Sequence, residues 1–271
     1  MANNKVPTDG LRQWVAGRLG NADALVSQRN AGMYDADDAQ ILLCAAVSAM
    51  AANHWPRNAG GNDRARFVQF LVEYGSQDLS LTFVSIFYLT RLMSRNPKFT
   101  KECDILARRT ACAPLPLGGA APGRVGTGPG ALSNGMDVDA DIVETWLAEN
   151  GPLTEELRKM VRKAGYASII YQDLRCGLFH EHRRGEALGR WSATTHSGPH
   201  YVVAFDGDGT PSWRLCLPYE YVREVVERAL LRACDWLDGS LQFVRCRKAT
   251  RLVPDCWWID PVMASTPVRD N

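Results

Sequence analysis

The chain has almost no excess of charge of either sign. Its 271 residues include 31 basic and 30 acidic side chains, which leaves a formal net charge of +1. A polyanionic partner would therefore have to be attracted by a local basic patch, because the whole molecule has no strong field. Hydrophobic residues make up 46% and charged residues 23% of the chain, ordinary values for a globular protein that exclude wholesale disorder.

The sequence also lacks cysteine pairs, long apolar runs and a leader-like N-terminus. Its eight cysteines include no CxxC pair and no regular spacing, so neither a disulfide framework nor a zinc site is predicted. Scattered cysteines of this kind indicate a reducing compartment. No apolar run approaches the roughly 18 residues that span a bilayer, and the N-terminus has no signal-peptide pattern. We therefore expect a cytoplasmic protein without a membrane segment, a metal or a cofactor.

Helical spacing of apolar residues runs through most of the chain and predicts a mainly α-helical bundle. A short docking helix is expected within residues 1–36, and acidic Asp37 and Asp38 suit the start of the next helix. The expected helices cover residues 39–53, 64–74, 79–93, 98–112, 140–149, 154–163 and 219–238. Asp137, Asp139 and Asp141 are interpreted as favouring the start of the helix at 140.

Glycine and proline divide this bundle into parts. Residues 113–136 are rich in Gly, Pro and Ala and are expected to form a loop between the first helices (37–112) and the second part of the bundle (137–240). Segments 188–195, 200–205 and 212–217 are short and rich in Trp, Tyr, Val and Thr. They predict a small antiparallel β-meander at 188–217 within the helical fold. Residues 1–36 and 241–271 are the terminal segments, the second of them irregular.

Residues 166–184, YASIIYQDLRCGLFHEHRR, form the candidate functional region, here called the motif segment. Read as one α-helix at roughly 100° per residue, it has an apolar stripe that faces a core. The stripe consists of Ile170, Tyr171, Leu174 and Leu178. On the opposite side Gln172 and Cys176 are central, and Arg175 and His180 flank them. Gly177 indicates that another helix or a ligand approaches closely, since glycine inside a helix costs roughly 0.5–1 kcal/mol.

The run from Arg175 to His180, with Tyr171 before it and Glu181 after it, resembles the RxxxxH motif of the HEPN superfamily of helical ribonucleases. This resemblance implies a helical bundle in which Arg175 and His180 are catalytic. The site-supporting positions that it implies are Tyr171, Cys176, Gly177, Glu181 and His182. The chain departs from the family pattern at Cys176, where active relatives often carry Asn, His or Asp.

These residues predict a metal-independent endoribonuclease. RNA carries its own nucleophile, the 2′-hydroxyl, so the enzyme needs a group that moves a proton and a cation that holds the phosphate. Histidine titrates near neutrality and arginine binds phosphate with two donors, which fits His180 and Arg175 to these roles. The candidates for binding the RNA backbone are Arg162, Lys163, Arg183 and Arg184, although a solvated helix face has the same composition.

The resemblance also implies partners. Two protomers of HEPN type place their motif helices together, so we expect a homodimer with Cys176 and Gly177 in its seam. A setting in toxin–antitoxin control or phage defence, with an antitoxin or a nucleotidyltransferase partner, is what family membership would imply.

A non-catalytic alternative remains open from the sequence. The chain would then be an HEPN-like interaction or regulatory domain in which Arg175 pairs with Asp173 or Glu181. Cys176 and the near-neutral charge favour this alternative. Of the other histidines, His54 is expected to pack against its neighbours, while His196 and His200 are candidates to line the mouth of a site.

Overall fold

The computed structural model describes residues 8–27, 36–54, 63–75, 79–110, 132–181, 184–189, 197–205 and 211–239. Most of the loop expected at 113–136, the segment 190–196, the turn at 206–210 and the residues from 240 onward lie outside these ranges.

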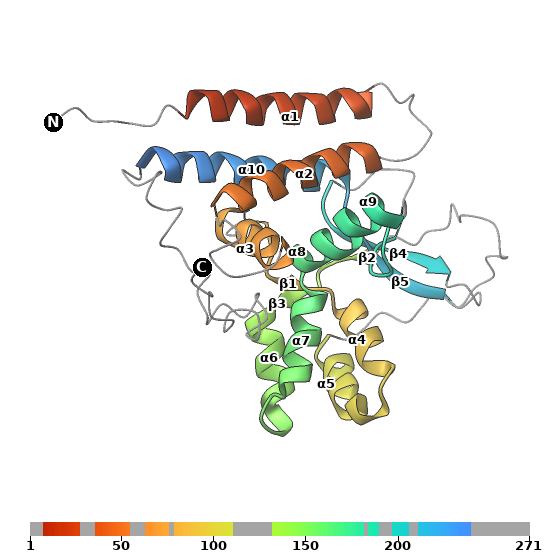
Figure 1. Cartoon of the computed structure of the whole chain (residues 1–271). Coiled ribbons are helices and arrows are strands. Elements are labelled where there is room, and N and C mark those ends of the chain that lie inside the picture. The colour runs from red at the N-terminus through yellow and green to blue at the C-terminus, as the bar shows by residue number, and fades with distance from the viewer. Residues whose placement is uncertain are drawn as a thin grey trace.

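The structure is mainly helical, as predicted, and Figure 1 shows its elements. The helices are α1 (Asp9–Ser27), α2 (Asp37–His54), α3 (Asp63–Gly75), α4 (Ile86–Ser94), α5 (Thr100–Thr110), α6 (Ala140–Leu147), α7 (Glu155–Ala164), α8 (Tyr166–Ile169), α9 (Gly177–Glu181) and α10 (Tyr219–Gly239). Single 3₁₀ turns occur at Pro97–Phe99 and Ala148–Asn150, and a π-helical stretch, Ile170–Cys176, joins α8 to α9. We call this stretch the π segment.

Polar residues set several of the helix starts. Asp37 and Asp38 open α2 as predicted. The hydroxyl of Thr154 accepts the backbone N–H of Leu157 at 3.3 Å and caps α7. The helix expected at 79–93 begins only at Ile86, because β1 (Phe83–Val84) pairs with β3 (Val138–Asp139) before it. Side-chain caps satisfy N–H groups that a helix start leaves unpaired.

Two groups of helices pack around the motif segment (Figure 1). Helices α1, α2, α3 and α10 contact one another in one group, and α4, α5, α6 and α7 form a chain of contacts in the other. Between them, α8 contacts both α3 and α7, and the π segment contacts α2 and α3. A single core of buried side chains runs through both groups. The motif segment therefore lies at the centre of the fold.

The β-structure differs from the predicted meander. Strands β4 (His200–Phe205) and β5 (Pro211–Cys216) pair antiparallel, as expected. The third strand of their sheet is β2 (Leu132–Ser133), and the order is β2-β4-β5. Of the segment expected as a strand at 188–195, Leu188 forms a parallel bridge to Leu215, and residues 190–195 lie outside the described ranges. The third strand of this sheet therefore comes from β2, which precedes the motif segment in the chain.

Candidate functional site

The motif segment is not one regular α-helix. Its central seven residues, Ile170–Cys176, form the π segment, and the N–H of Gly177 bonds to the carbonyl of Gln172, five residues earlier. A projection at 100° per residue therefore misplaces side chains in this stretch. Ile170, Leu174 and Leu178 are buried as predicted, but Tyr171 is only half-buried. Short π-helical insertions are frequent at functional sites.

The loop that follows the motif segment closes over the π segment at Asp173. The N–H of Gly185 donates to the backbone carbonyl of Asp173 at 2.8 Å, and the N–H of Ala187 donates to its Oδ1 at 3.0 Å. A Cβ atom at Gly185 would lie 2.6 Å from Cγ and 2.8 Å from Cα of Asp173. Asp173 is buried, and burial raises the pKa of its carboxyl group. A close approach that the sequence did not indicate therefore occurs at Gly185.

Gly177 itself is buried inside the protomer, where α9 contacts α2. Gly177 therefore offers little surface to a second copy in this conformation, and the homodimer with Cys176 and Gly177 in its seam stays a prediction. Cys176, next to it, is half-buried and stays accessible in part.

Arg175 is held in place by neutral groups. Its Nε donates to Oγ of Ser48 on α2 at 3.0 Å, and its Nη1 lies 3.5 Å from Sγ of Cys176. The guanidinium carbon lies 5.1 Å from the centre of the Tyr171 ring, a cation–π distance. Arg175 forms no ion pair with any described residue, so it pairs with neither Asp173 nor Glu181. The structural interpretation of Arg175 as half of a salt bridge on its own helix is wrong.

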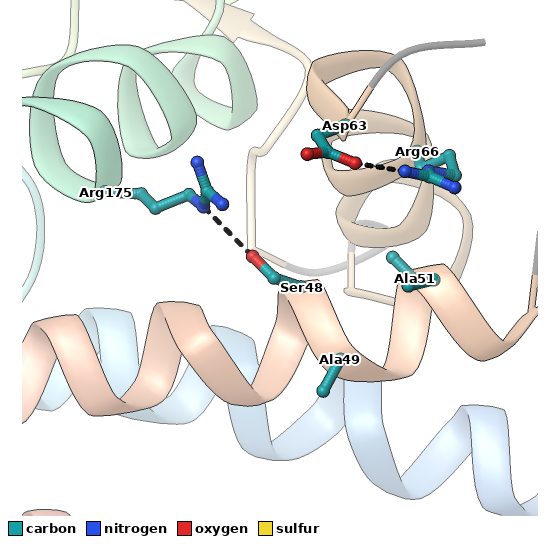
Figure 2. A pocket seen from close by; sticks show the side chains of 7 residues that line it. Ser48, Ala49, Ala51, Asp63, Arg66 and Arg175 are labelled. Atoms are coloured by element: carbon teal, nitrogen blue, oxygen red, sulfur yellow. Dashed lines mark hydrogen bonds and ion pairs between the residues drawn. The ribbon is translucent and has the colours of Figure 1, made fainter. Parts of the chain in front are cut away.

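Arg175 borders a hollow of about 480 Å³ between α2, the first turn of α3 and the π segment (Figure 2). The hollow is lined by Ser48, Ala49, Ala51, Ala52, Asp63, Arg66 and Arg175. Arg66 is buried and forms an ion pair with Asp63. Figure 2 shows this pair and Arg175 on opposite sides of the same space. Sequence reasoning missed Arg66, because an Asp and an Arg three residues apart usually form an ordinary pair on an exposed helix face.

His180 lies at the other, exposed end of the motif segment. Its ring is edge-on to that of Phe179, with 5.1 Å between the ring centroids. Phe179 is itself 61% exposed, and within the described residues His180 has no hydrogen-bond partner. The hollow that Arg175 borders does not include His180 in its lining.

Two predicted RNA-binding arginines are not on the surface. The Nε of Arg184 donates to Oδ1 of Asp37 at 2.9 Å and its Nη2 to Oε1 of Gln40 at 3.0 Å, and the side chains of Arg184 and Asp37 are only 10% and 12% exposed. Arg162 is buried on α7, 3.5 Å from Glu155. The prediction that Arg162 and Arg184 form part of an exposed basic patch is therefore wrong.

The other residues expected near the site have mixed outcomes. Lys163 is half-buried, and Glu181 and Gln172 are exposed. His182 and Arg183 lie outside the described residues, as does His196.

Both described histidines outside the motif segment are structural. His54 packs edge-on against Trp236, its ring nitrogen is 3.0 Å from the Tyr74 hydroxyl, and burial lowers its pKa to about 4. Packing was the predicted role of His54. His200 is buried at the start of β4, with Nδ1 3.0 Å from the carbonyl of Gly198, so it does not line an open mouth.

A buried carboxylate anchors the start of the motif segment. Asp137 accepts the hydroxyl of Tyr201 at 2.6 Å, the hydroxyl of Tyr166 and the N–H of Ile86 at 3.0 Å. Burial raises the pKa of Asp137 to about 6. Asp139, not Asp137, caps the helix at 140, since its Oδ1 accepts the N–H of Asp141 at 3.0 Å. Asp137 thus ties α4, α8 and β4 together, a role that local sequence does not indicate.

Comparison with known proteins gives no relative: no family model matches the chain, and neither a curated protein nor a solved structure matches it. Within the described residues, no three side chains of His, Cys, Asp or Glu are grouped as a metal site requires. No helix in the same ranges is both long and apolar enough to cross a bilayer. The functional argument therefore depends on the geometry of Arg175 and His180.

Proposed function

We propose that the chain is a metal-independent endoribonuclease in which Arg175 holds a phosphate and His180 transfers a proton. The observation that carries this proposal is the state of Arg175. Ser48 and Tyr171 orient its guanidinium beside an open hollow, yet no described carboxylate neutralises its charge. An exposed imidazole without a hydrogen-bond partner in the described chain follows on the same segment. The resemblance of this segment to the HEPN motif supports the same assignment.

The chemistry needs only arginine and histidine side chains and the substrate. The Nη2 atom of Arg175 makes no hydrogen bond within the described chain and is available for a phosphate oxygen. A charge-assisted bond of this kind strengthens as the phosphorane gains negative charge. His180 removes the proton of the 2′-hydroxyl, which attacks the adjacent phosphorus and expels the 5′-oxygen. A protonated imidazole then supplies the proton that the leaving oxygen takes up.

A second copy of the chain completes the site in this proposal. One His180 per protomer leaves one of the two proton transfers without a group, and a two-fold axis supplies the second imidazole. With Gly177 enclosed, we place the seam at the exposed end of α9, where Phe179 offers an apolar contact beside His180. A setting in toxin–antitoxin control or phage defence, with an antitoxin or nucleotidyltransferase partner, has the family resemblance as its support.

The test is incubation of the purified protein with total RNA and with transfer RNA in the presence of EDTA. Cleavage is expected for the wild type and is expected to be lost in His180→Ala and in Arg175→Ala. Gln13→Ala, a change at an exposed position of α1, is the control and should cleave normally. Intact RNA in every sample would favour the non-catalytic alternative, an interaction or regulatory domain.

A further inference from the structure

The walls of the hollow bordered by Arg175 differ in chemistry. One wall is α2, which contributes only small side chains, Ser48, Ala49, Ala51 and Ala52. The facing walls carry the charged groups, Arg175 from the π segment and the Asp63–Arg66 pair from α3 (Figure 2). An amphipathic ligand would meet an apolar surface on one side and guanidinium groups on the other.

The charge of the lining selects an anion. Two arginines and one aspartate line the hollow, which gives it a formal charge of +1. Asp63 is paired with Arg66, so its carboxylate does not neutralise Arg175. Arg66 is 5% exposed, and its charge is therefore screened less by solvent than that of a surface arginine. A singly charged phosphodiester matches this balance, and Arg175 Nη2 is positioned to donate to it.

The size of the hollow limits how large a part of a nucleic acid can bind in it. Its volume of about 480 Å³ lies within the range of small-ligand sites, roughly 300–1,000 Å³. It can take one nucleotide unit but not a base pair. Bases enter pockets of this kind when the strand is single and the base can be turned out of its stack. Small alanine side chains leave room for the ribose and the base.

We infer that the hollow is a single-nucleotide site of a single-stranded RNA substrate. The phosphate would bind Arg175 and be attracted by the nearby charge of Arg66, and the sugar and base would pack against Ala51 and Ala52. This inference rests on the proposed function for the identity of the ligand as RNA. It adds that the substrate is unpaired where it is bound, and it assigns Arg66 as a phosphate-site residue.

The test measures binding without cleavage. A fluorescein-labelled single-stranded RNA with 2′-O-methyl groups throughout cannot be cut by its own 2′-oxygen, and its affinity is read by fluorescence anisotropy. Ala52→Phe fills the hollow from an exposed position without removing a charge, so the fold should be preserved. It should weaken binding by about tenfold, the scale of one nucleotide's contribution. Ala16→Phe, the same change at an exposed position of α1, should leave the affinity unchanged.

Two further arms sharpen the result. Arg66→Gln should flatten the dependence of log Kd on log salt by about 0.7, the slope of one phosphate contact to a single strand. The circular dichroism spectrum of Arg66→Gln shows whether this variant is folded. If it is not, the RNA affinity of Ala52→Phe tests the nucleotide site alone. The same RNA annealed to its complement should bind the wild type and Ala52→Phe equally, because a paired strand cannot enter the hollow. Inorganic phosphate at millimolar concentration should not displace the single strand.

The outcomes separate this inference from the proposed function. Equal single-strand affinities for the wild type and Ala52→Phe would overturn the nucleotide site even if RNA is cleaved. Displacement by inorganic phosphate would overturn it as well, since the hollow would then hold a simple anion. A tenfold loss in Ala52→Phe with no RNA cleavage by the wild type would support the site and refute the nuclease.

Discussion

Replacement of Gly185 by alanine tests how the motif segment is held. The added Cβ would lie 2.6 Å from Cγ and 2.8 Å from Cα of Asp173, and atoms in real proteins do not approach so closely. Because one of these atoms belongs to the backbone of the buried π segment, a change of rotamer at Asp173 does not relieve the contact. The loop must move away instead. That movement breaks the bonds from Gly185 N–H and Ala187 N–H to Asp173.

The expected loss follows from these two effects. Overpacking a close-packed site costs about 1–3 kcal/mol, and each hydrogen bond lost costs about 1 kcal/mol. We therefore expect Gly185→Ala to lower the free energy of unfolding by about 3–5 kcal/mol, measured by urea titration with circular dichroism. Gly17→Ala is the control, since a Cβ at Gly17 in α1 meets nothing within 4 Å. It should stabilise by roughly 0.5–1 kcal/mol. A Gly185→Ala variant as stable as the wild type would refute this packing of the loop.

Three further predictions concern the core and its charges. Leu174→Ala removes a fully buried side chain from the π segment and should lower the free energy of unfolding by about 2–5 kcal/mol in the same titration; a surface-like loss below about 0.5 kcal/mol would contradict the burial. Arg184→Ala leaves the carboxylate of Asp37 buried without its partner, so it should destabilise by about 3–5 kcal/mol and leave the salt dependence of RNA binding unchanged; a flatter salt slope would restore Arg184 to the RNA site. The pKa of Asp137 is raised from 3.8 to about 6 in the folded protein, so wild-type stability should fall as pH rises between these values, by up to about 3 kcal/mol. The difference in unfolding free energy between the wild type and Asp137→Asn, measured from pH 4 to 7, isolates this group, and a difference that does not change with pH would show that the raised pKa is wrong.

The helices were predictable because their signals are local. The spacing of apolar residues identified nearly every long helix, and Asp37 and Gly239 mark ends that the sequence indicated. The helix predicted at 79–93 begins too early, because Val84 belongs to a strand that pairs with Val138, fifty-four positions later. No pattern within a dozen residues contains that information.

The site was predictable only in part, for the same reason. Arg175 and His180 stand out through a motif, and their catalytic roles stay a prediction. Among the described residues Arg175 has no ion pair, and His180 is exposed. The π winding was not predictable from apolar spacing, and the bond from the N–H of Gly185 to the carbonyl of Asp173 joins residues twelve positions apart. Arg184 and Arg162 look like surface cations in the sequence, and their burial is visible only in the folded chain.

The chemistry of the cleaved ends distinguishes attack by the 2′-hydroxyl from hydrolysis by water. RNA incubated with the protein in EDTA should yield upstream fragments that end in a 2′,3′-cyclic phosphate and downstream fragments with a free 5′-hydroxyl, because the internal 2′-oxygen is the nucleophile. The rate should change between about pH 5 and 8, the range in which an imidazole titrates, and His180→Ala should give no product. Downstream fragments that carry 5′-phosphates, or activity that chelation removes and magnesium restores, would indicate hydrolysis through bound cations and would contradict the roles assigned to Arg175 and His180.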